Sequence, residues 1–247
     1  MARIHLDKLS ADPPESLNKH EIKEQTKKLQ EDIDELQNRL YAEHKHSLLI
    51  LFQGMDASGK DGAIRKVFES VNPQGISVHS FKVPSAEEAD HDFLWRIHKQ
   101  TPAKGMIKIF NRSHYEDILV TRVHKLINDK TAKQRIKAIN DFEQLLTSNN
   151  THLLKFYLHI TPEEQKDRLA ERLEIRRKMW KYNSNDIKEA KSWAIYRKYY
   201  EDCFEACNSV PWTIVPSNKN WYKEYLVAKT VHDKLKSLKS QYPKINV

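Results

Sequence analysis

The sequence is poor in the features that mark secreted and membrane-spanning proteins. Its 247 residues include only two cysteines, Cys203 and Cys207, which are too few for a structural zinc site and unsuited to a disulfide scaffold. No apolar run approaches the roughly twenty residues that a membrane helix needs, and the N-terminus lacks the apolar core of a signal peptide. We therefore expect a cytoplasmic protein with free thiols that does not associate with membranes.

Glycine is also scarce, and three of the five glycines fall within the nine residues 54–62. The five apolar residues 48–52 lead into this stretch, and residues 63–69 after it have helix-forming composition. The order strand, loop, helix is the context that a phosphate-binding loop requires. Glycines permit tight turns and close backbone approach, so amide N–H groups can line an anion site at the positive end of the helix.

This stretch matches most of the phosphate-loop pattern G-x-x-x-x-G-K-[ST]. Gly54 and Gly59-Lys60 fit the pattern, whereas Asp61 replaces the Ser or Thr, and Asp56 adds a second carboxylate. Two acids would repel a polyphosphate unless cations lie between them, so we interpret Asp56 and Asp61 as groups that face Mg²⁺. The alternative is a glycine-containing turn without a ligand, but the flanking strand and helix favour a phosphate loop.

The composition indicates a rather polar protein with an excess of positive charge. Hydrophobic residues make up 39% of the chain and charged residues 31%, and the formal net charge is +8. Such a charge favours polyanionic partners, which include nucleic acid, anionic lipid and phosphate polymers. Because basic residues lie beside acids and no nucleic-acid-binding motif frames them, we expect no nucleic-acid partner.

Predicted strands alternate with predicted helices along the chain. The later strands are expected at residues 76–83, 106–110, 153–160 and 210–215. This alternation predicts an α/β fold with a parallel sheet of about five strands and helices on both faces. We expect one domain over residues 1–247. It begins with an arm at 1–18 and an amphipathic helix from 20 to about 44, which packs on the domain or on a second subunit.

Polar residues follow the third predicted strand directly. Ligands of parallel sheets bind beyond the carboxyl ends of the strands, so residues 111–117 are expected to face the phosphate loop. Arg112 can bind phosphate oxygens with its fork of N–H groups, and Glu116 and Asp117 could complete a Mg²⁺ site or orient the acceptor. The alternative reading of the two acids is a helix N-terminus with favourable charges, which does not explain Arg112.

A stripe of arginines follows the fourth predicted strand. Thr161-Pro162 marks a helix start, and the i, i+4 spacing places Arg168, Arg172 and Arg176 along one face. Neighbouring acids could pair with them as an ordinary solvated surface. Because the stripe begins at the carboxyl end of a strand, we favour a lid over phosphates, within residues 163–195.

Aromatic residues in the same part of the chain could stack on a base. Helical spacing is more typical of core packing, which we predict for Trp193, Tyr196, Tyr199 and Tyr200. For Trp180 the sequence does not choose between base stacking and core packing.

Four stretches together resemble the second type of polyphosphate kinases, the polyphosphate:nucleotide phosphotransferases. They read Gly-Met-Asp-Ala-Ser-Gly-Lys-Asp-Gly at 54–62, Val-Asn-Pro-Gln-Gly at 71–75, His-Asp-Phe-Leu-Trp-Arg at 91–96 and Phe-Asn-Arg-Ser-His-Tyr-Glu-Asp at 110–117. The resemblance implies a P-loop kinase-like fold, a helical lid, dependence on Mg²⁺ and phosphoryl transfer between inorganic polyphosphate and nucleotides.

The candidate site combines the residue patterns with this resemblance. The candidate metal ligands are Asp56, Asp61 and Asp117, and the candidate catalytic residues are Asp56, Lys60, Arg112, Glu116, Asp117 and Arg172. The candidate phosphate and nucleotide ligands are Gly54, Ala57, Ser58, Gly59, Lys60, Asp61, Gly62, Lys66, Arg112, Arg122, Arg168, Arg172 and Arg176.

The sequence motif Ser-His-Tyr-Glu-Asp at 113–117 resembles that of the subgroup that phosphorylates both nucleoside monophosphates and diphosphates. It implies AMP, ADP, GMP and GDP as acceptors, with Glu116 as the residue that discriminates among them. The rival hypotheses are an ATP-dependent nucleotide kinase of the same fold and a non-catalytic polyanion-binding module. The first and last predicted helices offer surfaces for a homo-oligomer, which we expect to be a dimer or tetramer.

Overall fold

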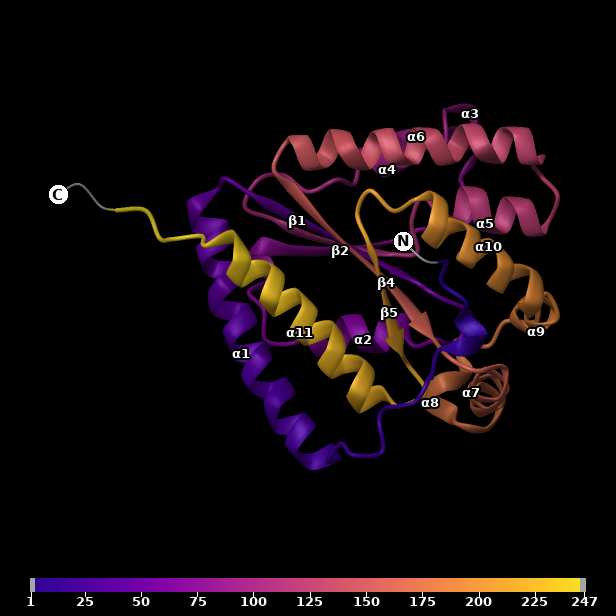
Figure 1. Cartoon of the computed structure of the whole chain (residues 1–247), viewed down its shortest axis with the longest axis horizontal. Coiled ribbons are helices and arrows are strands. Elements are labelled where there is room, and N and C mark those ends of the chain that lie inside the picture. Colours follow the sequence, from indigo (N-terminus) through magenta and orange to yellow (C-terminus); the bar gives the residue numbers. More distant parts are fainter. Residues whose placement is uncertain (1–2, 245–247) are drawn as a thin grey trace.

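The protein is built around one parallel sheet, seen in a computed structural model that describes residues 3–244 (Figure 1). Within these residues the sheet has five strands in the order β2-β3-β1-β4-β5, all parallel, as predicted. The strands are β1 (Ser47–Gln53), β2 (Ile76–Ser80), β3 (Ile107–Asn111), β4 (Thr151–His159) and β5 (Trp212–Pro216). The carboxyl ends of all strands therefore meet at one edge of the sheet.

Helices cover both faces of the sheet. One face is covered by α1 (Lys19–Glu43), α2 (Lys60–Val67) and α11 (Asn220–Leu238), and the other by α4 (Trp95–His98), α5 (Glu116–Val123), α6 (Asp129–Ser148) and α10 (Trp193–Ala206) (Figure 1). Beyond the strand ends lie α7 (Pro162–Glu174), α8 (Arg176–Met179) and α9 (Ser184–Ala190), and α3 (Ala86–Asp90) follows β2. Two short 3₁₀ helices complete the described elements, η1 (Leu6–Lys8) and η2 (Pro73–Gly75).

Strand β1 is buried on both faces, which explains its uninterrupted apolar sequence. Its side chains alternate between the two cores: Leu49 and Leu51 pack toward α6 and α10, whereas Leu48, Ile50 and Phe52 pack toward α1 and α11. The strand is thereby held rigidly from both sides, and so is the loop that follows it.

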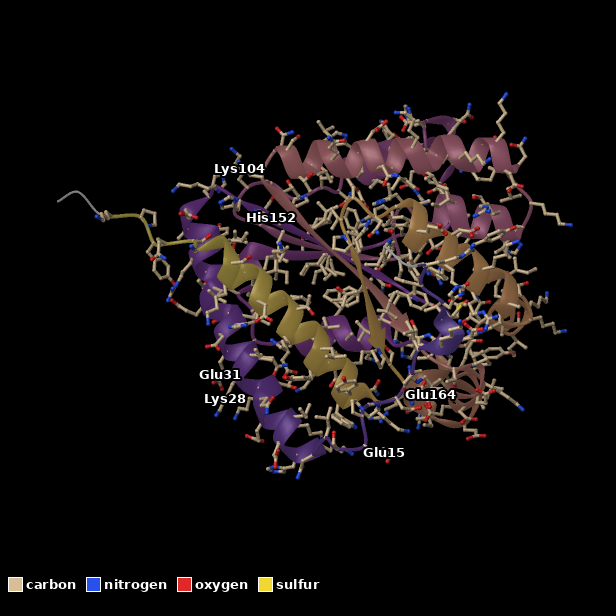
Figure 2. The ribbon with its side chains drawn as sticks, in the orientation of Figure 1. Glu15, Lys28, Glu31, Lys104, His152 and Glu164 are labelled. Carbon is tan, nitrogen blue, oxygen red and sulfur yellow. The ribbon has the colours of Figure 1, made fainter. Side chains whose placement is uncertain are left out.

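The long helix α1 packs lengthwise against α11 (Figure 1). Its apolar residues Ile33 and Leu40 are buried, whereas Lys28 and Glu31 point outward (Figure 2). The predicted amphipathic helix therefore uses its apolar face within the chain itself. No helix of residues 3–244 is long and apolar enough to cross a membrane.

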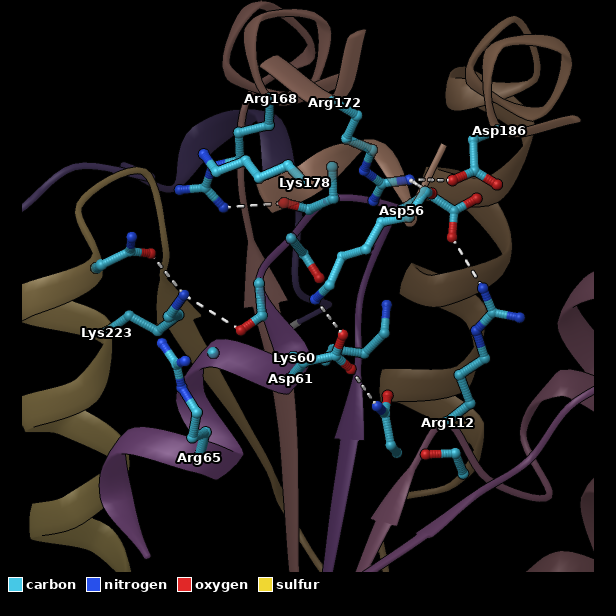
Figure 3. Close-up of a pocket in the computed structure, with 18 of the residues that line it drawn as sticks. Asp56, Lys60, Asp61, Arg65, Arg112, Arg168, Arg172, Lys178, Asp186 and Lys223 are labelled. Carbon is cyan, nitrogen blue, oxygen red and sulfur yellow. Dashed lines mark hydrogen bonds and ion pairs between the residues drawn. The ribbon is translucent and has the colours of Figure 1, made fainter. Parts of the chain in front are cut away.

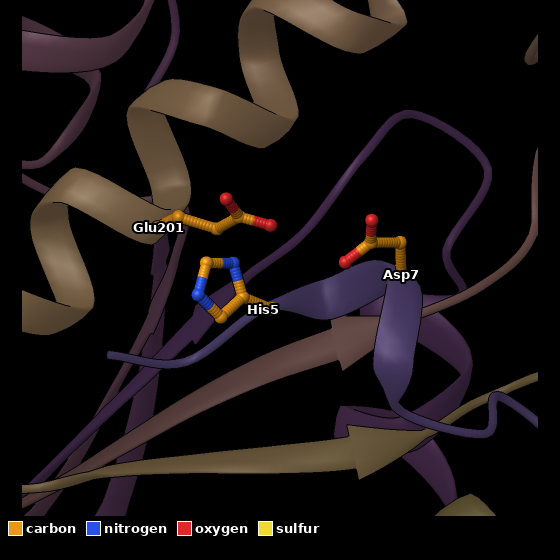
Figure 4. A group of neighbouring side chains, drawn as sticks. All are labelled: His5, Asp7 and Glu201. Atoms are coloured by element: carbon orange, nitrogen blue, oxygen red, sulfur yellow. The ribbon is translucent and has the colours of Figure 1, made fainter. Parts of the chain in front are cut away.

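The N-terminal arm lies on the body of the protein, with residues 1–2 outside the described part. Leu6 is buried, and its N–H donates to a Glu201 carboxylate oxygen at 2.9 Å. His5 and Asp7 flank this contact (Figure 4). The arm is thus held near the carboxyl ends of the strands by α10.

A buried ion pair lies beneath the loop that follows β3. Lys155 of β4 donates to Glu143 of α6 at 2.8 Å, to the Tyr115 hydroxyl at 2.9 Å and to the Cys207 carbonyl at 3.0 Å. Tyr115 in turn donates to Glu143 at 2.6 Å. Every N–H of this lysine therefore has an acceptor, and the network holds the β3–α5 loop to the sheet.

Candidate active site

The phosphate loop occupies residues 54–59, between β1 and α2. Gly54 has φ +147°, and a side chain there would meet the Leu158 carbonyl at 2.8 Å. Ala57 takes a left-handed φ of +61°, which is uncommon for a residue other than glycine. The buried Ser58 hydroxyl has no hydrogen-bond partner among the described residues. The loop is thus an open turn that leaves a buried polar group free to meet a ligand.

Lys60 lies at the start of α2, with its ammonium folded back over the loop. It donates to the carbonyls of Gly54 at 2.8 Å and Met55 at 3.3 Å. Burial and the nearby Arg112 charge lower the pKa of Lys60 to about 8, although Asp56 and Glu116 act in the opposite direction. Burial and Arg112 therefore oppose the charge of Lys60 more strongly than the nearby carboxylates support it, and a bound anion would stabilise the ammonium.

A cavity of about 770 Å³ opens above this loop (Figure 3). Ten cationic side chains line it against five carboxylates, so much of the net charge of the protein gathers here. The cations are Lys60, Arg65, Lys66, Lys82, Arg112, Arg168, Arg172, Lys178, Lys181 and Lys223. The chemistry of this lining suits a ligand with several negative charges.

A second cavity of about 270 Å³ adjoins the first. Its walls include the aromatic side chains of Trp193, Tyr196 and Tyr200. These residues were predicted to be core, and only Tyr200 is fully buried, so the prediction is corrected for Trp193 and Tyr196. They pack against the core with one side and face the cavity with the other. Flat aromatic walls suit the nucleoside part of a ligand.

The two cavities share the ion pair of Asp56 and Arg112. The guanidinium donates to the carboxylate at 2.9 Å, and both residues line both cavities. Burial opposes the charge of Arg112, but the carboxylates of Glu116 and Asp56 outweigh it and raise the pKa of the guanidinium. Arg112 takes a left-handed φ of +62°, a strained conformation of the kind that clusters at functional sites. A group passed from one cavity to the other would meet this pair.

Other acids lie around the junction. Glu116 faces the second cavity and accepts from the Gln53 amide at 3.0 Å, and burial raises the pKa of its carboxyl. Asp61 faces the first cavity and accepts from Asn111 at 2.6 Å and Lys181 at 2.7 Å. Burial raises the pKa of Asp61, but these two donors more than reverse this and leave it lowered.

Comparison with known proteins identifies the family. The family model described as Polyphosphate kinase 2 (PPK2) matches residues 16–243. The chain belongs to the polyphosphate kinase 2 family. This confirms the resemblance drawn from the four sequence stretches, and with it the class of enzyme.

Individual relatives agree with the family model. The AMP/ADP-polyphosphate phosphotransferase of Meiothermus ruber is 45% identical over 213 residues, which cover 85% of this chain and 80% of the relative. The ADP-polyphosphate phosphotransferase of Rhodopseudomonas palustris is 39% identical, over 86% and 78% of the two chains. The crystal structure of Polyphosphate Kinase 2 from Arthrobacter aurescens TC1 superposes with a TM-score of 0.95 at 38% identity, covering 99% of this chain and 89% of that chain. The predicted P-loop kinase-like fold class is thereby confirmed.

The structure brings most of the predicted site residues together, but three lie elsewhere. Asp117 lines neither cavity; it lies 3.5 Å from Arg96 and 3.8 Å from Arg135. Successive helix residues point about 100° apart, so Asp117 turns away when Glu116 faces the cavity. Its prediction as a catalytic residue and metal ligand is therefore corrected to a structural pairing.

Arg122 and Arg176 also lie outside both cavities. Arg122 lies 3.3 Å from Asp202 and covers the Tyr199 ring at 3.8 Å, which holds α5 to α10. Arg176 is exposed, because α7 ends at Glu174 and the next residue is extended, so the i, i+4 stripe stops at Arg172. Both predictions as phosphate ligands are corrected accordingly.

Arg168 lines the first cavity, but its donors are largely engaged within the protein. It donates to Glu164 at 2.7 Å and to the carbonyls of Ala57, Ser217 and Asn218 at 3.0, 2.6 and 3.0 Å. Arg168 therefore clamps α7 to the phosphate loop and to the start of α11. Arg172 pairs with Asp186, donates to the Lys181 carbonyl at 3.2 Å and lines the cavity.

Several cavity residues were missed from the sequence. Lys178 and Lys181 lie within the predicted lid at residues 163–195, but the sequence pattern did not identify them as single ligands. Asp186, whose carboxyl pKa is raised by burial and by Asp56, had no sequence signal. Neither had Lys223, which lies in the last helix, more than 150 residues after the phosphate loop.

The donor set fits a divalent cation of the Mg²⁺ type. Asp56, Asp61 and the Ser58 hydroxyl, which has no hydrogen-bond partner in the described part of the chain, offer the hard oxygen ligands that Mg²⁺ prefers. This ion usually takes one or two carboxylates, with the remaining ligands from water and phosphates. The group of three potential metal ligands found within residues 3–244, His5, Asp7 and Glu201, lies on the N-terminal arm and α10 instead (Figure 4).

Proposed function

We propose that the chain catalyses the reversible, Mg²⁺-dependent transfer of a phosphoryl group from inorganic polyphosphate to nucleoside mono- and diphosphates. The acceptors are AMP, ADP, GMP and GDP, and the products are nucleoside di- and triphosphates. The observation that carries the proposal is the pair of cavities that meet at Asp56 and Arg112. A cationic cavity suits the polymeric donor, an aromatic cavity suits the nucleoside, and the relatives are named for polyphosphate, AMP and ADP.

In this proposal the protein catalyses transfer by positioning the groups and compensating their charge. Phosphoryl transfer needs little covalent help, because the attacking and leaving oxygens need only be held in line. Lys60 and Arg112 lie where negative charge would spread over the transferred group, and Arg172 approaches from α7. Arg112 must release part of its contact with Asp56 to bind phosphate, and its fork of donors allows it to bind both.

Asp56 and Asp61 would hold Mg²⁺. The ion supplies neutralising charge between these acids and the phosphates. The chain itself keeps the two carboxylates at the rim of the loop, with Lys181 and Asn111 orienting Asp61.

Glu116 is proposed to discriminate among acceptors. Its carboxylate faces the second cavity beside Arg112, at the place that the terminal phosphate of a nucleotide would approach. A monophosphate and a diphosphate differ in how far their charge extends, so a fixed acid at this position affects them differently. Residues 163–195 act as the lid within a single domain. The cytoplasmic location and the homo-oligomeric state stay predictions.

The test is a panel of AMP, GMP, ADP and GDP with polyphosphate as the only donor, and the phosphorylated products are separated by chromatography. We expect di- and triphosphate products that require added Mg²⁺. A parallel panel with ATP as donor tests the rival hypothesis of an ATP-dependent nucleotide kinase. That hypothesis predicts faster transfer from ATP than from polyphosphate. Binding of polyphosphate without transfer to any acceptor would favour the rival hypothesis of a non-catalytic polyanion-binding module.

A further inference from the structure

Lys223 of α11 reaches the phosphate loop from outside the loop motif. Its side chain is buried, with 1% of its surface exposed, and yet it lines the cationic cavity (Figure 3). Its ammonium donates to the Asn220 side chain at 2.8 Å and to the Gly59 carbonyl at 3.3 Å. The last helix therefore brings a positive charge to the loop at the point where α2 begins.

Gly59 provides the space for this ammonium. Gly59 has φ +92°, and a side chain there would lie 2.3 Å from the Lys223 nitrogen. Any other residue at 59 would therefore displace Lys223 as well as strain the backbone. The glycine of the loop and the lysine of the last helix form one structural unit.

The charge of Lys223 is not neutralised by a close carboxylate. Glu224 and Glu164 act on it through space, but within residues 3–244 neither forms a hydrogen bond or ion pair with it. Burial and the neighbouring Arg168 lower the pKa of Lys223 to about 8. An ammonium has three N–H groups, and the two acceptors above leave one without a partner in the described chain. A buried cation of this kind is stabilised when an anion completes its contacts.

Lys60 has a similar arrangement, but it binds carbonyls at the beginning of the loop, whereas Lys223 binds the carbonyl of Gly59 at the end. Its ammonium also binds loop carbonyls, also lacks a close carboxylate partner within residues 3–244, and also has a pKa lowered to about 8 by burial. Figure 3 shows Lys60 between Lys223 on one side and Arg112 on the other.

We propose that Lys223 is a second phosphate-binding lysine of the loop, which holds a phosphate unit of inorganic polyphosphate on the side away from Arg112. The proposal rests on the proposed function, since it takes polyphosphate as the occupant of the cationic cavity. The cavities meet at Arg112, so the unit held by Lys223 is not the transferred one. Lys223 therefore holds the polymer and sets its KM, while kcat depends on the groups at the junction.

The first experiment measures polyphosphate binding by calorimetry, without nucleotide, at several salt concentrations. Lys223→Met is expected to weaken binding about tenfold, the size typical of one charge-assisted hydrogen bond. The slope of log Kd against log salt should fall by roughly 0.7, as for one lost phosphate contact on a single-stranded polyanion. The control is Lys236→Met, which removes an exposed lysine from the same helix and should leave both values unchanged. Equal affinity and slope in Lys223→Met and wild type would overturn the proposal.

A second variant covers the case in which Lys223→Met does not fold. Lys223→Arg keeps the charge at every pH, whereas the wild-type lysine loses it as pH rises through about 8 in the free protein. The charged groups that face this position are Arg168 and Glu164 from α7 and Glu224 from α11 itself, and Lys66 of α2 and Lys23 of α1 act on Glu224. Polyphosphate affinity should therefore fall less between pH 7 and 9 in Lys223→Arg than in wild type, and identical profiles contradict the proposal.

The outcomes separate this inference from the proposed function. If wild type binds polyphosphate but transfers nothing, the proposed function fails while the Lys223 comparison can still be made. If wild type transfers phosphate and the Lys223 variants bind and respond like wild type, only the role of Lys223 fails. A change in kcat rather than in the KM for polyphosphate would place Lys223 in the transfer step and contradict the positioning role.

Discussion

Lys155 of strand β4 and Lys60 at the start of helix α2 lie in opposite electrostatic settings. The side chain of Lys155 is fully buried, and its three N–H groups are bound by Glu143, Tyr115 and the Cys207 carbonyl. Within residues 3–244, Lys60 has two carbonyls as its hydrogen-bond acceptors, and it lines a cavity. The first charge is neutralised within the fold, whereas the second is held in place without being neutralised. We infer that a closed network supports the structure and an open one binds ligand.

The largest effect is expected from Lys60→Met, which removes the open charge. Phosphoryl transfer should fall by about a thousandfold or more, as for the loss of a preorganised group that stabilises the transition state. The melting temperature should change little, because Lys60 forms no ion pair with the carboxylates of residues 3–244. Rates of ATP formation from ADP and polyphosphate measure the effect, with Lys137→Met on the exposed face of α6 as the control. Transfer at wild-type rates would remove Lys60 from the mechanism.

Lys155→Met should instead lower the stability of the protein. Leaving Glu143 buried without its cation should cost about 3–5 kcal/mol in the free energy of unfolding. The double variant Lys155→Met/Glu143→Gln should recover part of this loss, because neither charge then remains. Urea denaturation measures all three proteins. If the single variant is as stable as wild type, the closed network does not support the fold.

Acid pH should weaken the closed network. Burial raises the pKa of Glu143, but the hydrogen bond from His114 and the charge of Lys155 outweigh it and leave the pKa below 4.5. The unfolded chain therefore binds more protons than the folded one as pH falls, so the stability from this carboxylate is present above about pH 4.5 and is lost below. Urea denaturation from pH 6 to pH 3 should show this loss in wild type and a smaller one in Lys155→Met/Glu143→Gln. Parallel curves for the two proteins would exclude Glu143 as the source.

The smallest effect is expected from Arg122→Met. Arg122 is paired with Asp202 and stacked on Tyr199, so it belongs with the closed contacts although its sequence position suggested phosphate. The KM for polyphosphate and for ADP should change by less than about twofold, and the melting temperature should fall by a few degrees. Steady-state kinetics measure the two KM values, and a thermal melt measures the change in stability. A large rise in the KM for polyphosphate would restore Arg122 to the site.

The sequence predicted those parts of the site that depend on local pattern. The order strand, loop, helix located the phosphate loop, and Thr161-Pro162 located the start of α7, where Thr161 accepts from the Glu164 N–H at 3.2 Å. The ends of elements were less certain, as Arg176 shows, because an i, i+4 spacing continues in a sequence even after the helix has ended.

What the sequence could not predict depends on tertiary packing. Which of two adjacent acids faces a cavity depends on how the helix is oriented about its own axis. The sequence does not give this orientation for α5, so it could not show that Glu116 faces the cavity and Asp117 does not. Lys223 carries no local signal, because its neighbours read as an ordinary amphipathic helix. Only the packing of α11 against α2 brings it to Gly59.

The meeting of two cavities at one ion pair has a kinetic consequence. Because Asp56 and Arg112 line both spaces, a donor and an acceptor can occupy the protein together. Under the proposed function, a ternary complex then forms before any bond breaks, and no phosphoryl group is carried by the protein itself. Double-reciprocal plots at several fixed acceptor concentrations would accordingly intersect, rather than run parallel as in a ping-pong mechanism.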